Sequence, residues 1–269
     1  MNNNTLAVIG VGNMAGSMLR WVCESTEISG FYLYDVNKKA YEPFVGKNGF
    51  CFADSIEDAA IEASHVLLSV KPQNYPEVLS ELKKVDGYRK KIYISIGAGI
   101  TVDSVSSALD GAVVIRALPN LPVSIGKGVS AICRNQNATE EAMLLVKNMF
   151  GAFGSVIEID EEEMNRIIGV TSSAPAYVFK FINAICKGAE AQGLDGQAML
   201  RDICLMVIGS AELLMSSEYT PEELISKVAS KGGTTEQALI KLDEGKFDEA
   251  LQNAMIACTA RADELGKHK

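Results

Sequence analysis

The chain has 269 residues, of which 48% are hydrophobic and 22% charged, a composition typical of folded globular proteins and unlike that of disordered ones. Its formal net charge of −9 argues against a nucleic-acid partner or an anionic membrane surface, since both reward dense positive charge. The length predicts two domains.

The few cysteines and histidines limit the possible chemistry. None of the six cysteines forms a CxxC pair, so we expect neither a zinc knuckle nor a dithiol redox motif. His65 and His268 are too few for a histidine-built metal site or a Ser-His-Asp triad on an ordered scaffold, and we expect no metal. The start MNNNTLAVIG shows no secretory signal and no apolar run could cross a bilayer, which predicts a cytoplasmic protein.

Short apolar runs alternate with helical stretches through the first half of the chain. The predicted strands are Leu6–Gly10, Phe31–Asp35, His65–Val70, Lys91–Gly97 and Gly111–Ala117. Strand, helix and strand follow between Val129 and Ile159, with the helix over Thr139–Phe150. This alternation predicts a parallel sheet with helices on both faces.

The pattern changes near Asp160, beyond which we predict only helices. Met164–Gly193 is one long helical candidate, in which Pro175 marks a potential break, and Gly196–Ser217 is a second. The sequence therefore predicts an α/β domain over residues 1–162 and an all-α domain over residues 163–269.

Two later segments have the spacing of capping boxes at helix starts. They are Thr220–Glu223, with Pro221 at the first helical position, and Thr234–Gln237.

Two of the predicted helices are apolar over more than half of their circumference. Their sequences are YVFKFINAIC and ICLMVIGSAELLM. A domain of about 100 residues cannot bury both of them on all sides by itself. We expect a second subunit to cover them; the alternative is that the α/β domain does so.

The segment GVGNMA has the pattern of a dinucleotide-binding turn between a strand and a helix. Gly10 permits the tight turn, Gly12 lets the backbone approach a pyrophosphate, and Ala15 allows close packing of the helix on the strand. Asp35 ends the next predicted strand, where a carboxylate accepts hydrogen bonds from a ribose hydroxyl pair. The pattern predicts a Rossmann-like domain; the alternative is a plain glycine turn and a strand-end aspartate.

Asp35 also bears on the choice of cofactor. Its carboxylate repels a 2′-phosphate, which favours NADH over NADPH. Lys38 and Lys39 follow within a turn and are able to hold that phosphate, or they are a solvated helix face, so NADPH stays open.

The segment VASKGGTTEQAL, residues 228–239, is the most informative part of the second domain. Gly232 and Gly233 allow close approach of a ligand just before a predicted helix, which suits a carboxylate. Ser230, Thr234 and Thr235 add hydroxyls that can donate to an oxygen or a ring nitrogen. The alternative is an ordinary capping box after a flexible turn.

The sequence resembles the pyrroline-5-carboxylate reductase family over nearly its whole length. The resemblance rests on the order and spacing of six segments: VIGVGNMAGSML, SVKPQ, SIGAGIT, IRALPNLP, GVTSSAPAYVF and VASKGGTTEQAL. It implies reduction of the cyclic imine 1-pyrroline-5-carboxylate to L-proline, the last step of proline biosynthesis, with a hydride from NADPH or NADH. A protonated imine is a good electrophile, so this chemistry needs no histidine.

The resemblance also assigns residues to roles. It implies that Thr235 hydrogen-bonds the substrate nitrogen, that Ser230 opens the substrate loop, and that Gly233 and Thr234 hold the carboxylate. We expect Thr235 and Ser230 to be catalytic and Gly232 to bind substrate with its two neighbours. The expected cofactor positions are Ile9, Gly10, Gly12, Asn13, Met14, Asp35, Val70, Lys71, Pro72, Gly97 and Ala98. Asn120 matches the asparagine in the loop after the last core strand, and we expect it to bind substrate.

Five positions depart from the family motifs. Lys231 replaces a proline, Ser172 and Ala174 replace glycines, Leu121 replaces a threonine, and Lys227 stands where relatives often carry asparagine. Together they admit a divergent member with an altered substrate or activity.

For assembly, the resemblance implies a homodimer through exchanged helical domains, and it leaves open a larger ring such as a decamer. Each site would then combine the α/β domain of one chain with the helical domain of its partner.

Two other readings of the sequence stay open. One is a β-hydroxyacid-type dehydrogenase, although Lys180 and Asn183 stand three apart instead of in that group's Lys-x-x-x-Asn spacing. The other is a non-catalytic NAD(P)-binding regulator, against which the intact box of Ser230 and Gly232–Thr235 argues.

Overall fold

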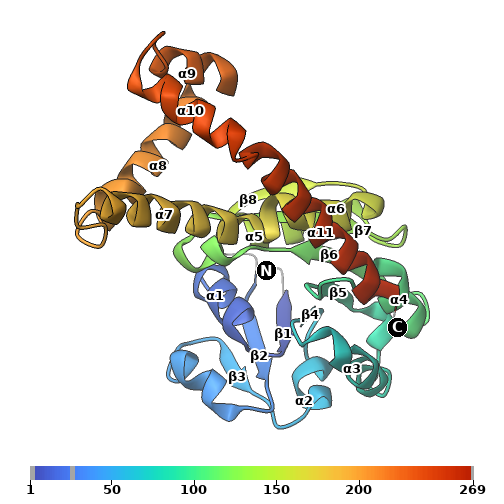
Figure 1. Cartoon of the computed structure of the whole chain (residues 1–269). Helices are drawn as coiled ribbons and strands as arrows, with labels where there is room; N and C mark the ends of the chain where they lie inside the picture. The colour runs from blue at the N-terminus through green and yellow to red at the C-terminus, as the bar shows by residue number, and fades with distance from the viewer. Residues whose placement is uncertain (1–3, 25–27, 268–269) are drawn as a thin grey trace. The chain divides into compact units, whose positions relative to one another are not determined.

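The computed structural model describes residues 4–24 and 28–267; His268 lies outside them. The chain forms two compact units, one of Met1–Ser173 with Ala257–Lys269 and one of Ala174–Ile256. Figure 1 colours the chain along its length. This division falls later than the predicted boundary after residue 162. It also assigns Ala257–Lys269, which we expected in the helical domain, to the first unit.

An eight-stranded sheet forms the centre of the first unit. Its strands are β1 (Thr5–Ile9), β2 (Gly30–Tyr34), β3 (Phe50–Phe52), β4 (His65–Leu68), β5 (Ile92–Ser95), β6 (Val113–Leu118), β7 (Gly128–Arg134) and β8 (Gly154–Glu158). Their order across the sheet is β3-β2-β1-β4-β5-β6-β7-β8. The predicted α/β class with a Rossmann-like sheet is confirmed.

The sheet is not parallel throughout, which corrects one expectation. Strand β7 pairs antiparallel with β6, and β8 then pairs parallel with β7. The physical reason is the short connection over residues 119–127, since a parallel return needs a crossover of a dozen residues or more.

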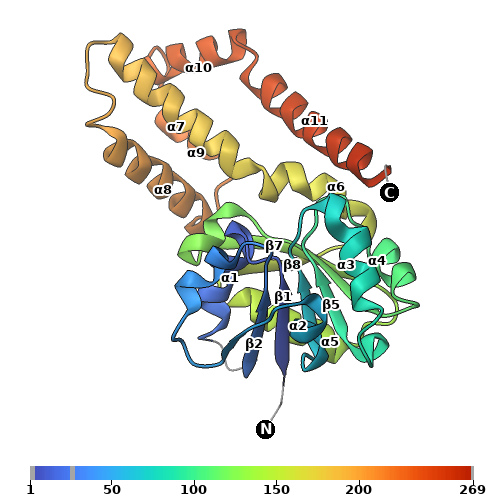
Figure 2. The ribbon, with the colours of Figure 1, turned by 90° about the horizontal axis from the view of Figure 1, so that it is seen from below.

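Five helices cover the two faces of this sheet. They are α1 (Asn13–Val22), α2 (Ile56–Ile61), α3 (Tyr75–Leu82), α4 (Val102–Ala108) and α5 (Glu140–Gly151). Alternate residues of β1 point to opposite faces: Ala7 and Ile9 join the core under α2, α3 and α4, whereas Leu6 and Val8 join the core under α1 and α5. Figure 2 shows the strands running between these helices.

The remaining helices belong to the second half of the chain. They are α6 (Met164–Ile167), α7 (Ala174–Ala191), α8 (Leu200–Ser216), α9 (Pro221–Val228), α10 (Thr234–Glu244) and α11 (Phe247–Lys267). The single helix expected over Met164–Gly193 is interrupted by a π-helical turn, η6 (Ile168–Ser172), which carries the chain from α6 toward α7. The interruption lies before Pro175, because proline fits the first turn of a helix, where its missing N–H costs nothing.

One of the two predicted capping boxes is confirmed and the other is wrong. Thr220 and Glu223 cap α9 reciprocally, with Pro221 at the first helical position. In α10, however, Gly233 is the N-cap, so Thr234 lies inside the helix and caps nothing. The carboxylate of Glu236 instead accepts a hydrogen bond from the Gly232 N–H at 2.7 Å.

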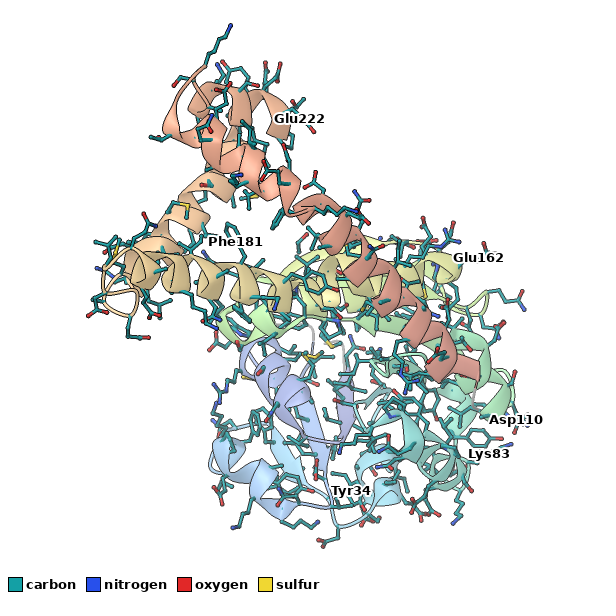
Figure 3. The ribbon with its side chains drawn as sticks, viewed as in Figure 1. Tyr34, Lys83, Asp110, Glu162, Phe181 and Glu222 are labelled. Carbon is teal, nitrogen blue, oxygen red and sulfur yellow. The ribbon has the colours of Figure 1, made fainter. Side chains whose placement is uncertain are left out.

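The second unit exposes many large apolar side chains. On α7, Val178, Phe179 and Phe181 are exposed, and only Cys186 and Ala189 are buried (Phe181 is labelled in Figure 3). On α8 only Ile203 is buried. Among the described residues, no helix combines the length and the apolar character needed to cross a membrane.

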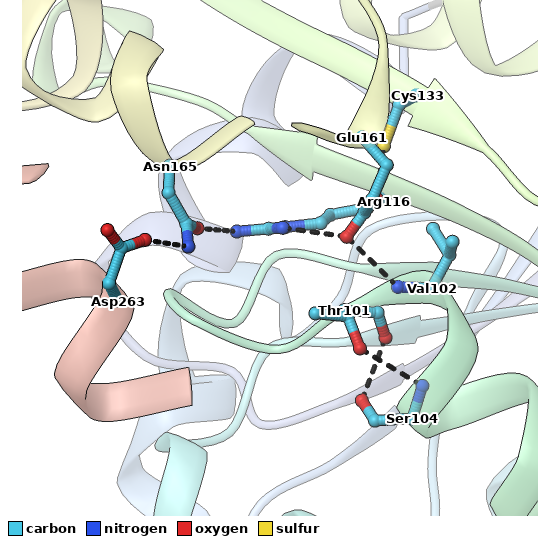
Figure 4. Close-up of polar contacts among 8 residues, drawn as sticks. All are labelled: Thr101, Val102, Ser104, Arg116, Cys133, Glu161, Asn165 and Asp263. Carbon is cyan, nitrogen blue, oxygen red and sulfur yellow. Dashed lines mark hydrogen bonds and ion pairs between the residues drawn. The ribbon is translucent and has the colours of Figure 1, made fainter. Parts of the chain in front are cut away.

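A buried arginine ties five segments of the first unit together (Figure 4). Arg116 of β6 has a side chain that is 1% exposed, and it donates to Glu161 Oε1 at 2.9 Å and to Asn165 Oδ1 at 2.9 Å. Glu161 also accepts from the Val102 N–H at the start of α4 and from the Cys133 thiol of β7. Burial, with Glu161 alongside, raises the pKa of that thiol, so it stays protonated.

The same network reaches the last turns of the chain. Asn165 Nδ2 donates to Asp263 Oδ1 of α11 at 2.8 Å, and Ala262 beside it is buried. The end of α11 is therefore held against the sheet through α6, and α6 leads directly into the π-helical turn.

We expect Glu161→Gln to lower the free energy of unfolding by about 2 kcal/mol, because it leaves the buried guanidinium of Arg116 without its counter-charge. The cost stays below that of a fully buried pair, because the Glu161 side chain is 29% exposed. Urea unfolding followed by circular dichroism at fixed protein concentration measures it. Glu162→Gln, an exposed change on the same turn, is the control, with an expected effect under about 0.5 kcal/mol. Equal effects of the two changes would contradict this account.

Candidate functional site

The glycine turn after β1 has the geometry of a phosphate-binding turn. Gly10 lies in the left-handed region at φ +94°, and a Cβ there would lie 2.8 Å from the Ser69 carbonyl oxygen. Gly12 is the N-cap of α1 and makes no side-chain cap, and no acidic residue occupies the first turn. The first N–H groups of α1 therefore suit a phosphate group.

The carboxylate of Asp35 is built into this turn. Asp35 Oδ2 accepts the Val11 N–H at 2.7 Å, and Oδ1 accepts the Asn37 N–H at 2.8 Å. A negative charge is thus fixed beside the turn, where it would repel a 2′-phosphate on the ribose of a bound dinucleotide. Lys38, which the sequence offered as a phosphate ligand, donates from Nζ to the Ala53 carbonyl at 3.0 Å and pairs with Asp54 at 3.4 Å.

A cavity of about 330 Å³ lies where β4, β5 and β6 end. Its lining residues are Met14, Ser69, Val70, Ile96, Ala98, Leu118, Pro119, Ile168, Ser172 and Ser173. Three of the predicted cofactor positions, Met14, Val70 and Ala98, are thus brought together here. Most of the lining is apolar, which suits the flat face of a ring.

Tyr75, which the sequence did not single out, joins the ends of two strands next to this cavity. Its hydroxyl donates to the Leu68 carbonyl at 3.0 Å and pairs with Ser95 Oγ at 3.0 Å, so it joins the ends of β4 and β5. Burial raises the pKa of Tyr75 to about 12. A Cβ on Gly97 would lie 2.6 Å from the Tyr75 hydroxyl, so glycine is required there by packing.

Lys71 and Pro72 lie just beyond β4. Lys71 is the N-cap of the short 3₁₀ helix η2 (Pro72–Asn74), which leads into α3, and its neighbour Val70 lines the cavity. They therefore lie next to the cavity along the chain, although neither lines it.

Both the oxygen and the nitrogen of the Asn120 side-chain amide make hydrogen bonds. Oδ1 accepts the Val129 N–H at 2.9 Å, and Nδ2 donates to the Thr171 carbonyl at 3.1 Å. The residue is buried and holds the π-helical turn against β7. Its visible contacts are with the backbone, so its predicted role toward substrate stays a prediction.

The segment Ser230–Thr235 belongs to the second unit and opens α10. Gly232 has φ +76°, and the Gly233 N–H donates to the Ser230 carbonyl at 2.9 Å. A Cβ on Gly233 would lie 2.6 Å from Ser230 Oγ, so this loop is closed tightly around the serine. Neither Thr234 nor Thr235 caps the helix, and both hydroxyls are available to a ligand at its N-terminus.

The described residues contain no group of three or more His, Cys, Asp or Glu side chains placed to hold a metal ion. The arrangement fits a dinucleotide by three features: the uncapped start of α1, the close approach at Gly10, and the apolar cavity at the strand ends.

Comparison with known proteins matches both halves of the chain. Residues 5–99 match the family described as NADP oxidoreductase, coenzyme F420-dependent, and residues 161–265 match the family described as pyrroline-5-carboxylate reductase dimerisation. The pyrroline-5-carboxylate reductase of Methanosarcina acetivorans is 31% identical over 99% of this chain and 100% of its own length. The chain belongs to the pyrroline-5-carboxylate reductase family.

Further members of the family agree with this assignment. The pyrroline-5-carboxylate reductase of Synechocystis sp. is 32% identical over 97% of this chain and 98% of its own length. The solved structure of a pyrroline-5-carboxylate reductase from Coxiella burnetii superposes with a TM-score of 0.88 at 28% identity, covering 98% of this chain and 99% of that one. The resemblance stated from the sequence is confirmed.

Three glycine variants test the phosphate-binding turn. Gly12→Ala adds a Cβ with nothing within 4 Å, so the fold survives, but the methyl group occupies the approach of a pyrophosphate and NADH affinity falls at least about 10-fold. Gly10→Ala lowers stability as well, because of its φ and the contact with Ser69. Gly16→Ala, in open space within α1, is the control: it leaves NADH affinity unchanged, and stability rises by about 0.5–1 kcal/mol because alanine favours a helix over glycine. Melting scans and NADH fluorescence titration separate the three. Full NADH affinity in Gly12→Ala would show that no phosphate approaches this turn.

Proposed function

We propose that this chain reduces 1-pyrroline-5-carboxylate to L-proline with a hydride from NAD(P)H. The observation that carries the proposal is full-length similarity to pyrroline-5-carboxylate reductases, together with an intact Gly232-Gly233-Thr234-Thr235 box at the start of α10. The chain is accordingly an oxidoreductase of the final step of proline biosynthesis.

The start of α10 suits the carboxylate of the substrate. The N–H groups of the first turn lack partners within the helix, and the helix dipole favours an anion there. Glu236 is an anion at the same helix start, and its carboxylate takes up the Gly232 N–H, so that N–H is not free for the substrate. The substrate carboxylate would meet the helix start at Thr234, beside Gly233, whose own N–H donates to the Ser230 carbonyl and holds the loop in place.

Thr235 would hold the ring nitrogen of the imine. Its hydroxyl is not used as a cap, and a hydroxyl both donates and accepts, so it can contact the nitrogen before and after the reaction. When bound, NAD(P)H supplies the hydride that the imine carbon takes up, and the protonated ring nitrogen becomes the amine of proline. The protein contributes orientation and a largely apolar cavity that limits water, and no histidine is needed.

The proposal includes a preference for NADH. The Asp35 carboxylate, fixed by the N–H groups of Val11 and Asn37, places a negative charge near the ribose of a bound dinucleotide. Lys38 is drawn to Ala53 and Asp54 and does not offset that charge at the turn.

The proposal also includes a homodimer formed through the helical unit. The exposed apolar side chains of α7 and α8 need covering surface, and residues 161–265 match a dimerisation family. A partner would then bring its own α10 to the cofactor-binding unit of the other chain. The proposal leaves room for a larger ring such as a decamer, and analytical ultracentrifugation would measure the mass of the assembly.

Turnover of 1-pyrroline-5-carboxylate with NADH is the direct test, and Thr235→Ala is the informative variant. We expect kcat/KM to fall about 100-fold, because a group that hydrogen-bonds the nitrogen as its charge changes acts in the transition state. Gln237→Ala, an exposed change on the same helix, is the control and keeps wild-type turnover.

Two results would overturn the proposal. Turnover of a β-hydroxy acid without turnover of the imine would favour the related dehydrogenases. Binding of NADH without any turnover would favour a regulatory protein.

The cofactor preference has its own test. We expect wild-type kcat/KM to be higher with NADH than with NADPH, and Asp35→Asn to shift the ratio toward NADPH about 10-fold, because it removes the negative charge at nearly constant shape. Asp58→Asn, exposed at the start of α2, controls for net charge and leaves the ratio unchanged. A ratio that does not respond to Asp35 would remove this residue from cofactor selection.

A further inference from the structure

Ser172 lines the 330 Å³ cavity, and its hydroxyl is shielded from water and finds no hydrogen-bond partner among the described residues. A buried hydroxyl without a partner costs about 1–3 kcal/mol. Native structures rarely retain such groups without a reason, and a ligand that completes the hydrogen bond is one such reason.

The backbone around Ser172 is held in place before any ligand arrives. Ser172 ends the π-helical turn η6, which the Ser173 N–H closes by donating to the Ile168 carbonyl at 2.8 Å. Asn120 holds the Thr171 carbonyl from the sheet side at 3.1 Å. Short π-helical turns within helices occur frequently at functional sites.

The neighbouring hydroxyls are already used. Thr171 Oγ1 donates to the Ile167 carbonyl at 3.3 Å. Ser173 Oγ accepts a hydrogen bond from the Cys258 thiol at 3.3 Å. Met14, Val70, Ile96, Ala98, Leu118 and Ile168 make most of the remaining lining apolar. The cavity therefore offers a largely apolar surface, and Ser172 carries the hydroxyl of this turn that has no partner among the described residues.

We infer that Ser172 Oγ is a hydrogen-bond partner of the carboxamide of the nicotinamide ring, and that it fixes the rotation of the ring in the cavity. An aromatic-sized ring that carries one amide group matches a largely apolar cavity beside the unpartnered hydroxyl of Ser172, since the hydroxyl can donate to the amide oxygen or accept from its nitrogen. The inference rests on the proposed function. It also gives a use to a residue that replaces a glycine of the family motif, because glycine has no side chain to make this contact.

Ser172 has a positioning role in this proposal, so loss of its hydroxyl should affect both cofactor binding and turnover. Loss of the hydroxyl should weaken binding of the whole dinucleotide but not of ADP-ribose, which has the same adenosine and phosphate groups and no nicotinamide. It should also lower kcat, because a ring that can rotate spends less time with its reacting face toward the imine.

The test is calorimetric titration of NADH and of ADP-ribose into wild type, Ser172→Ala and Ser172→Gly. We expect the Kd for NADH to rise about 5- to 10-fold in both variants and the Kd for ADP-ribose to stay unchanged. Ser155→Ala, an exposed serine of β8, is the control and changes neither. Melting scans on the same samples show whether the variants keep their fold.

Three outcomes would overturn the inference. An unchanged Kd for NADH would show that the hydroxyl does not contact the cofactor. A parallel loss for NADH and ADP-ribose would show that Ser172 acts through the fold of the turn. A higher KM for the imine at constant NADH affinity would assign the hydroxyl to the substrate. Failure of the proposed function would look different, because wild type itself would then bind NADH without reducing the imine, or would bind neither.

Discussion

The first unit depends on one buried charge. Arg116 of β6 has its guanidinium closed off from water, and Glu161, just after β8, neutralises it. A desolvated cation needs closely placed acceptors, so the hydrogen bonds from Arg116 fix the positions of Glu161 and Asn165. Asn165 in turn binds Asp263. Hydrophobic contacts supply most of the stability, but they do not by themselves fix where α6 begins.

From this charge a continuous set of contacts leads to the cavity. Asn165 lies in α6, which passes into the π-helical turn, and Asn120 fixes that turn from the strand side. The π-helical turn in the cavity wall is therefore held from two directions, while the hydroxyl of Tyr75 joins the ends of β4 and β5. Such support suits hydride transfer, because the chemistry relies on the placement of two rings and not on a strong acid or base.

The sequence predicted the features that depend on local pattern. The alternation of strands and helices, the glycine turn with Asp35 and the reciprocal cap at Thr220 are all readable from neighbouring residues, and the structure has them. The six family segments also predicted the family correctly.

Features that depend on residues far apart in the chain were not predictable. The partners of Arg116 lie 45 and 49 positions away, and nothing near position 116 indicates them. The antiparallel turn into β7 follows from the length of a loop whose ends the sequence does not mark. The N-cap moved from Thr234 to Gly233 because Glu236 reaches back to the Gly232 N–H, a competition between two caps that spacing alone does not resolve.

The division of the chain into units has a consequence for how the protein is made. The first unit needs Ala257–Lys267, yet the whole of the second unit is synthesised between Ser173 and that segment. During translation the sheet can form early, but Asn165 has no Asp263 to bind and Gly99 lacks the backbone of Ala262 and Gly266 that packs against it. The nucleotide-binding half of the chain is thus finished last, after the helical half has already emerged from the ribosome.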